Sequence, residues 1–266
     1  MLRKKHPVPG DEHVHFDAGA HVYTVRGKQV PISVTKLIER YAVPPEHRFD
    51  GNAIIRKNLT KWRSTSSNKY HSMVANASDA NAISAVLAHW RANAACGTAM
   101  HALFEDELNN KAPNAGGYEV EMAQFHAAMA SLDANVTPAR TELSVFATNA
   151  KGDAAVAGQI DLVLKDASKS YHLVDFKRTA ADLSPHASSY GKRFLDDLPL
   201  NDHYKYSLQL SLYRVMFELQ TGLRVEDDPR ILQIHPDLDE HQWTTTTDLT
   251  KQARGLLRQA GVAIEE

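Results

Sequence analysis

Cysteine and long apolar runs are nearly absent from this chain of 266 residues. The single cysteine, Cys96, allows no internal disulfide and no zinc or iron–sulfur site built from the chain's own cysteines. No stretch reaches the roughly 18 uninterrupted apolar residues that a membrane span needs. The start, MLRKKHPVPG, has basic residues but no apolar segment behind them, which argues against a signal peptide. These absences predict a soluble, intracellular protein that does not bind membranes.

An overall excess of one charge is also missing, since the formal net charge is -2, but the two signs are unevenly distributed. Residues 1–100 hold 14 Lys and Arg against 7 Asp and Glu, whereas residues 101–266 hold 16 against 25. A basic part beside an acidic part suits a protein that grips a polyanion with one and holds cations with the other. Uneven charge on a solvated surface is the alternative, and this feature alone does not separate the two.

Apolar residues make up 43% of the chain, as in ordinary globular proteins, and their spacing predicts both helices and strands. We expect strands at 13–17, 21–25, 141–148, 158–165, 171–179 and 230–236. We expect helices at 33–42, 79–95, 97–109, 118–132, 203–222 and 248–259. Gly97 and Thr98 predict a break, after which a new helix starts close against another backbone. The three consecutive strands between residues 141 and 179 predict an antiparallel meander.

A basic segment lies between Arg48 and Tyr70. Its cations stand among the aromatic residues Trp62 and Tyr70, a mixture that contacts phosphates and stacks on bases in proteins that bind single-stranded nucleic acids. The candidate cations are Arg56, Lys57, Lys61, Arg63 and Lys69. An ordinary exposed helix followed by a loop rich in Ser and Asn is the alternative interpretation.

The strands at 158–165 and 171–179 predict a hairpin with two carboxylates side by side. Residues of a hairpin face one another when they are equally far from the turn, and Asp161 and Asp175 each lie seven residues from Ser168. Their carboxylates are then expected roughly 5 Å apart on one face. Lys177 shares this face because it lies two residues beyond Asp175. The opposite face is apolar and consists of Ile160, Leu162, Leu164, Val174 and Phe176.

Two carboxylates this close repel each other unless a cation lies between them, and Mg²⁺ and Mn²⁺ prefer oxygen ligands. A lysine beside such a site orients or deprotonates a metal-bound water and stabilises charge on a phosphate under attack. The hairpin therefore indicates metal-dependent hydrolysis of a phosphodiester. A solvated surface cluster of two aspartates and a lysine is the alternative.

Two further pairs have the i,i+4 spacing that places side chains on one face of a helix. His101 and Glu105, in the segment GTAMHALFE, form one pair, and an imidazole added to the two carboxylates suits Mn²⁺ better than Mg²⁺ alone. Gln209 and Tyr213 form the other pair, whose side chains can hydrogen-bond a phosphate or hold the lysine and the metal ligands in place. A structural histidine and ordinary packing are the alternatives.

Five segments in order resemble the RecB-type branch of the PD-(D/E)XK nuclease superfamily. They are GTAMHALFE at 97–105, Glu142 on the strand before the hairpin, GQIDLVL at 158–164, VDFKRT at 174–179 and QLSLY at 209–213. An Asp-x-Lys triplet is common by chance, whereas five segments in order form a fairly specific pattern. Earlier in the chain, HVYTV, VPISVTKLIERY and FDGNAI are similar to segments of phage and viral exonucleases and of the mitochondrial genome maintenance exonuclease.

The resemblance implies an α/β (α+β) fold, with a central mixed β-sheet flanked by helices. Residues 97–266 are expected to form a restriction-endonuclease-like core, and residues 1–96 an N-terminal β-hairpin and helical portion that grips DNA, the two together as one compact unit. The implied metal ligands are His101, Asp161, Asp175 and the main-chain carbonyl of Phe176. The implied catalytic residues are Lys177, Asp175 and Asp161, supported by Glu105, Gln209 and Tyr213. Glu142 is an additional helper, and Arg178 is a further candidate for DNA contact.

The function that the resemblance implies is a Mg²⁺- or Mn²⁺-dependent exonuclease acting on single-stranded DNA or DNA ends, in recombination, repair or replication. Relatives with an iron–sulfur cluster use four cysteines, which this chain lacks. A helicase, a recombinase or a single-strand-binding protein is the expected kind of partner, and the phage relatives suggest a phage-encoded protein in a bacterial cytoplasm. A structure-specific endonuclease and a DNA-binding module with an unused site are the open alternatives.

Overall fold

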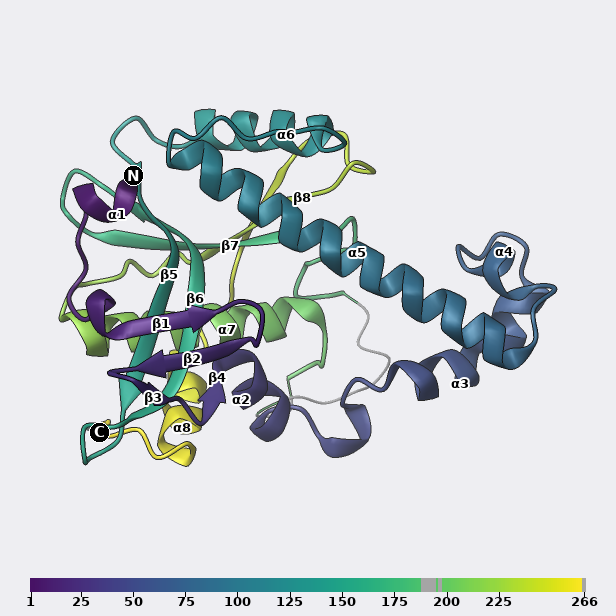
Figure 1. Cartoon of the computed structure of the whole chain (residues 1–266), viewed down its shortest axis with the longest axis horizontal. Coiled ribbons are helices and arrows are strands. Elements are labelled where there is room, and N and C mark those ends of the chain that lie inside the picture. Colours follow the sequence, from purple (N-terminus) through teal and green to yellow (C-terminus); the bar gives the residue numbers. More distant parts are fainter. Residues whose placement is uncertain (188–194, 196–197, 265–266) are drawn as a thin grey trace. The chain divides into compact units, whose positions relative to one another are not determined.

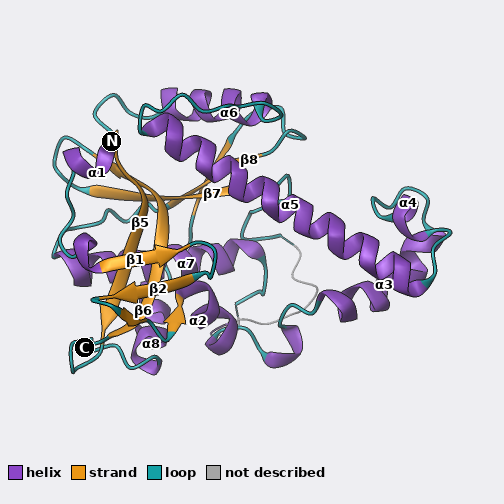
Figure 2. Cartoon of the chain, in the orientation of Figure 1, coloured by secondary structure: helices purple, strands orange, loops and turns teal. Residues whose placement is uncertain are grey.

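A computed structural model describes residues 1–187, 195 and 198–264 of the chain, and Figure 1 and Figure 2 show its mixture of helices and strands. The helices are α1 (Leu2–Lys5), α2 (Val34–Tyr41), α3 (Gly51–Ser64), α4 (His71–Val74), α5 (Asp79–Leu108), α6 (Glu119–Ala130), α7 (Asp202–Thr221) and α8 (Thr250–Gln259). The strands are β1 (Val14–Asp17), β2 (Val22–Val25), β3 (Lys28–Gln29), β4 (Ile32–Ser33), β5 (Thr137–Thr148), β6 (Ala154–Lys165), β7 (Tyr171–Arg178), β8 (Arg230–Ile234) and β9 (Gln242–Thr245). The structure thus adds the short strands β3, β4 and β9 to those predicted.

Six strands form one mixed sheet, and β1, β2 and β3 form a smaller one. In the large sheet β5 and β7 are antiparallel neighbours of β6, β8 runs parallel to β7, and β9 pairs antiparallel with β8. The predicted meander β5–β6–β7 is confirmed, and its hairpin has the predicted register, since Leu162 pairs with Val174. Strand β4 pairs in parallel with residues 156 and 157 of β6. The edge of β6 that does not pair with β5 therefore pairs with β4 at residues 156 and 157 and with β7 from residue 162 onward. Asp161 lies between these two paired stretches.

Helices pack against this sheet in two groups. The first group consists of α2, α7 and α8, and its buried core includes Leu37, Val163, Leu208, Phe217 and Leu257. The second group consists of α6 and the C-terminal end of α5, where Phe104 and Phe125 stack at 4.0 Å and both meet Phe176 edge-on. The predicted fold class, a central mixed sheet flanked by helices, is confirmed. In the described part of the chain, no helix combines the length and the apolar character needed to cross a membrane.

The chain forms two units, of which Glu46–Met100 is the smaller and Met1–Pro45 together with His101–Glu266 the larger. The predicted division placed all of residues 1–96 in the N-terminal portion. In the structure the hairpin of β1 and β2 belongs to the larger unit, because Tyr23 packs in one cluster with Phe146 and Ala157 of the large sheet. Apolar packing, and not the basic composition, sets this boundary.

The break predicted at Gly97 and Thr98 is wrong. Helix α5 continues from Asp79 to Leu108 without interruption. A Cβ added at Gly97 meets nothing within 4 Å among the described residues, so the expected close approach of another backbone is absent. Alanine is the strongest helix former, and the alanines around this position outweigh one glycine, which costs about 1 kcal/mol.

Candidate active site

Three side chains from three elements meet beside the central strand β6. His101 comes from α5, Glu142 from β5 and Asp161 from β6, and one ligand atom of each lies within 4.8 Å of the others. His101 Nδ1 is 3.6 Å from Asp161 Oδ1 and 4.0 Å from Glu142 Oε1. We call these three residues the carboxylate–histidine group.

Strand pairing brings the two carboxylates of this group together. The residues on either side of Glu142 pair with the residues on either side of Asp161, so that the two lie opposite each other. Opposed residues of antiparallel strands share a face of the sheet, with their Cβ atoms about 5 Å apart. Glu142, expected from the sequence only as an additional helper, therefore lies next to Asp161, whereas Asp175 lies outside this group of three.

The main chain of Phe176 ties the group to strand β7. Its N–H donates a hydrogen bond of 2.7 Å to Asp161 Oδ2, and its carbonyl oxygen lies 3.1 Å from His101 Nε2. A carbonyl oxygen only accepts hydrogen bonds, so Nε2 is the donor in this contact. The Phe176 carbonyl, which the resemblance implies as a metal ligand, thus lies beside the carboxylate–histidine group. It accepts a hydrogen bond from His101.

A second cluster surrounds the predicted catalytic lysine. Lys177 forms an ion pair with Asp175, and its Nζ lies 4.5 Å from the centre of the Tyr206 ring. Asp175 is only 2% exposed, and its Oδ1 accepts a hydrogen bond of 3.1 Å from Gln209 Nε2. The same nitrogen is 3.2 Å from Tyr213 Oη. The predicted pair on α7 therefore holds the buried carboxylate that in turn holds the lysine.

Gly158 provides the space that Tyr213 occupies. A Cβ at this position would lie 2.5 Å from Tyr213 Cε1 and 2.9 Å from Val34 Cγ2, and both distances are shorter than real carbon contacts. Gly158, the glycine of the segment GQIDLVL, therefore leaves the space in which Tyr213 packs beside the cluster around Lys177.

Burial and mutual charge shift the pKa values of these groups in different directions. Burial alone lowers the pKa of His101, but Asp161 and Glu142 outweigh it and raise this pKa to about 9. Burial, followed by repulsion from Asp161, raises the pKa of Glu142 to about 8. Burial likewise raises the pKa of Asp175 to about 6, against the attraction of Lys177. At neutral pH, His101 and Glu142 therefore hold protons that a metal ion has to displace.

Lys177 is a cation throughout the physiological range. Its burial disfavours the charge, but the carboxylates of Asp175 and Asp161 outweigh burial and raise the pKa of the ammonium group. A lysine with a raised pKa stabilises negative charge and is a poor base. Its chemistry is that of a fixed positive charge next to the carboxylate–histidine group.

Comparison with known proteins identifies the family. A sequence model described as the PD-(D/E)XK nuclease superfamily matches residues 68–260. The chain belongs to the PD-(D/E)XK nuclease superfamily. No curated protein matches its sequence. A solved structure titled "Crystal structure of SSO0001" is 15% identical over 88% of this chain and 76% of that chain, with a TM-score of 0.36, and a likeness of this size adds nothing to the assignment.

PD-(D/E)XK enzymes are nucleases, so membership of the superfamily makes DNA the class of substrate. These enzymes use divalent metals. The donor set fits such an ion, because Glu142 and Asp161 supply carboxylate oxygens and His101 an imidazole nitrogen. Asp175, Phe176 and Lys177, the Asp-x-Lys triplet expected from the sequence, lie on β7. Asp161 on β6 and this triplet on β7 thus lie on adjacent strands of one hairpin.

The predicted helper Glu105 lies one turn beyond His101 on α5 and is half-buried. Its negative charge contributes to the raised pKa of Glu142. Tyr23 of β2 is a residue near the site that the sequence analysis missed, and burial followed by the charges of Glu142 and Asp161 raises the pKa of its phenol. Nothing in its local sequence points to the site, because only the packing of the small sheet brings it there.

The basic segment in the smaller unit is only partly available to a ligand. Its exposed cations are Arg56, Lys57, Lys61 and Lys69. Arg63 instead donates to the carbonyls of Val74 and Ala77 and forms an ion pair of 2.8 Å with Asp79. The expectation that Trp62 stacks on bases is wrong, because it is buried in the core of this unit against Ile55 and Leu59.

Arg178 has a structural partner as well. Its Nε and Nη2 both donate to Glu121 Oε1, at 3.0 and 2.8 Å, and Glu121 is 2% exposed. The pair joins strand β7 to helix α6, both in the larger unit. The guanidinium predicted to contact DNA therefore neutralises a buried carboxylate.

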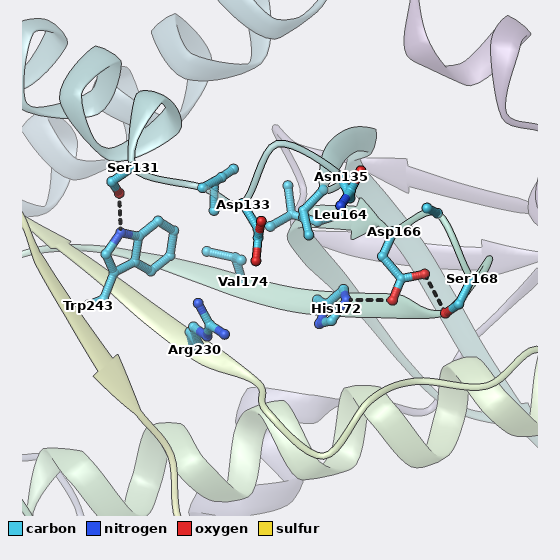
Figure 3. Close-up of a pocket in the computed structure, with 13 residues that line it drawn as sticks. Ser131, Asp133, Asn135, Leu164, Asp166, Ser168, His172, Val174, Arg230 and Trp243 are labelled. Carbon is cyan, nitrogen blue, oxygen red and sulfur yellow. Dashed lines mark hydrogen bonds and ion pairs between the residues drawn. The ribbon is translucent and has the colours of Figure 1, made fainter.

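A cavity of about 570 Å³ lies at the other end of the hairpin, around the turn between β6 and β7. Figure 3 shows Asp166 joined to His172 and to Ser168 at this turn. His172 hydrogen-bonds Asp166 and Asp228, at 3.4 and 2.7 Å, and Arg230 forms an ion pair with Asp228 at 2.7 Å. Of the described residues, none that we predicted as catalytic lines this cavity, and its internal pairing is that of a structural network.

Proposed function

We propose that this nuclease is a Mg²⁺- or Mn²⁺-dependent exonuclease of the RecB-type branch that degrades single-stranded DNA or DNA ends. The observation that carries the proposal is the meeting of His101, Glu142 and Asp161 within 4.8 Å, directly beside the ion pair of Asp175 and Lys177. Its RecB-type character rests on the histidine of α5 and on the pair Gln209 and Tyr213 on α7. The exposed cations of α3 support contact with a phosphate backbone.

The carboxylate–histidine group is the proposed metal site, with Asp175 and the Phe176 carbonyl as further ligands. A divalent cation bound by these residues would supply a nucleophile at neutral pH and would polarise the scissile phosphate. His101 and Glu142 would have to release their protons to act as ligands. The hydrogen bond from Phe176 N–H holds Asp161 Oδ2 in place, and Oδ1, which lies 3.6 Å from His101 Nδ1, would be the oxygen available to a metal ion.

Lys177 is proposed to stabilise the charge that develops on the phosphate during in-line attack. Its ammonium group is oriented by Asp175 and by the face of Tyr206, and Gln209 keeps Asp175 in position. A charge that is oriented before the reaction requires little reorganisation at the transition state. Losing such a group typically lowers kcat by about 10²- to 10³-fold.

Cleavage of end-labelled DNA tests the proposal. With Mn²⁺ or Mg²⁺, the chain is expected to shorten linear single-stranded DNA progressively, to leave circular single-stranded DNA intact and to stop when EDTA is added. Lys177→Ala and Asp175→Ala are expected to abolish cleavage and to retain DNA binding in a gel-shift assay. The double variant Lys57→Ala/Lys61→Ala is expected to bind DNA more weakly and to lose less than tenfold in rate at saturating DNA.

Each alternative gives a different result in the same assay. Cutting of the circle identifies an endonuclease. DNA binding without any metal-dependent hydrolysis on a panel of DNA and RNA substrates identifies a binding module with an unused site. Full activity of Lys177→Ala with metal present refutes the assignment of the catalytic centre.

A further inference from the structure

The backbone at Glu142 has an unusual conformation. Its φ is 46°, in the left-handed region that residues with a Cβ rarely adopt. Among the described residues other than glycine, His21, Arg26, Asn110 and Lys169 also have a positive φ, and all four lie in turns. Glu142 alone of these lies within a strand, and it carries a side chain of the carboxylate–histidine group.

Such a conformation persists only where neighbouring groups fix it, and it often occurs at functional sites. One neighbour is suited to this task. The side-chain amide of Gln159, on the adjacent strand β6, donates a hydrogen bond of 3.1 Å from Nε2 to the main-chain carbonyl of Glu142. Gln159 precedes Asp161 by two residues on β6. This strand therefore provides both Asp161 and the hydrogen bond that supports Glu142 on the neighbouring strand.

We propose that Gln159 is a positioning residue, which fixes the left-handed peptide of Glu142 and thereby directs the Glu142 carboxylate toward His101 and Asp161. The inference rests on the proposed metal site. Among the described residues, no hydrogen bond or ion pair joins the Gln159 side chain to His101 or Asp161, so it acts through the main chain of Glu142. Loss of an outer partner of this kind typically weakens metal binding by about 10- to 100-fold.

Gln159→Met tests the proposal, since methionine has a similar length and no donor. Titration calorimetry with Mn²⁺ is expected to show binding about 10- to 100-fold weaker than in the wild type. Half-maximal cleavage is expected to need correspondingly more Mn²⁺, whereas the rate at saturating Mn²⁺ recovers. The matched control is Gln124→Met, because Gln124 also donates to main-chain carbonyls, those of His235 and Leu238, and is expected to leave Mn²⁺ affinity unchanged.

A comparison at Glu142 tests the backbone directly and does not need a bound metal. Glycine adopts a positive φ readily, whereas alanine does not, so Glu142→Gly is expected to unfold at a higher urea concentration than Glu142→Ala. The usual order in a strand is the reverse. Equal stability, or a more stable alanine variant, contradicts a fixed left-handed peptide.

The outcomes separate this inference from the proposed function. If the wild type binds Mn²⁺ and cleaves DNA while Gln159→Met has the wild-type affinity, the positioning role is refuted and the nuclease assignment stands. If the wild type binds neither Mn²⁺ nor Mg²⁺ in the titration, the metal site itself is refuted.

Discussion

Replacing Gly158 with alanine is expected to disturb the cluster around Lys177 through packing alone. The new Cβ would lie 2.5 Å from Tyr213 Cε1, and an ordinary contact of 3.4 Å requires the ring to move by about 0.9 Å, the difference of these two distances. Tyr213 is 5% exposed, so it cannot turn into solvent. Overpacking of this kind costs about 1–3 kcal/mol.

The same movement reaches the catalytic groups. Tyr213 contacts Gln209, which holds Asp175, and Asp175 holds Lys177. A misplacement of about 1 Å lowers kcat by about 10²-fold. Urea unfolding followed by circular dichroism gives the loss of stability, and cleavage of end-labelled DNA at saturating DNA and saturating Mn²⁺ gives kcat.

Gly97→Ala is the matched control for this substitution. A Cβ at Gly97 meets nothing within 4 Å among the described residues, and alanine is favoured over glycine in a helix by about 1 kcal/mol. This variant is expected to be as active as the wild type and slightly more stable. Wild-type kcat and stability in Gly158→Ala would refute the packing argument.

Two further predictions concern charge. Arg178→Met is expected to destabilise the protein by about 3–5 kcal/mol in urea unfolding, because it leaves Glu121 buried and unpaired. The double variant Arg178→Met/Glu121→Leu is expected to regain most of this loss. Equal losses in both variants would count against a buried ion pair. The affinity for Mn²⁺ is expected to rise from pH 7 to pH 9. The pKa of His101 is raised to about 9 and that of Glu142 to about 8, so at lower pH both side chains hold protons that they must release to bind the ion. Calorimetry in buffers of different ionisation enthalpy is expected to show release of about two protons per metal ion at pH 7, and the absence of proton release would contradict these protonation states.

The hairpin could be predicted from the sequence because its information is local. Strand residues alternate between two faces, and a tight turn fixes the register, so the position of Ser168 was sufficient to place Asp161 near Asp175. The i,i+4 pair on α7 was predictable for the same reason, since helix geometry alone places Gln209 and Tyr213 on one face. The structure adds what these pairs contact.

Other features depend on contacts between residues far apart in the chain. The position of Glu142 opposite Asp161 follows from the pairing of β5 with β6, and its left-handed backbone leaves no mark in the local sequence. The partner of Arg178 lies on α6, and Trp62 is buried by residues of α5 as well as α3. The sequence analysis named both as candidates for DNA contact, whereas in the structure their packing stabilises the two units.

The two units of the structure have other bounds than the expected domains, for a related reason. The basic composition of residues 1–100 suggested one functional portion, but the first 45 residues complete the core of the larger unit. The charge of a segment indicates which ligands its surface attracts. Its apolar contacts determine the segments with which it shares a core. The two properties divide this chain at different residues.

The central claim is that Lys177 and the carboxylate–histidine group form the centre of a metal-dependent nuclease. Its most direct test is the rate at which the wild type, Lys177→Ala and the surface control Lys28→Ala shorten end-labelled single-stranded DNA in Mn²⁺. Lys28 is paired with Asp153 on the surface, so this control is expected to match the wild type. Loss of cleavage by about 10²-fold or more in Lys177→Ala alone is the predicted result. Equal rates in all three proteins, or no metal-dependent cleavage by any of them, would contradict the claim.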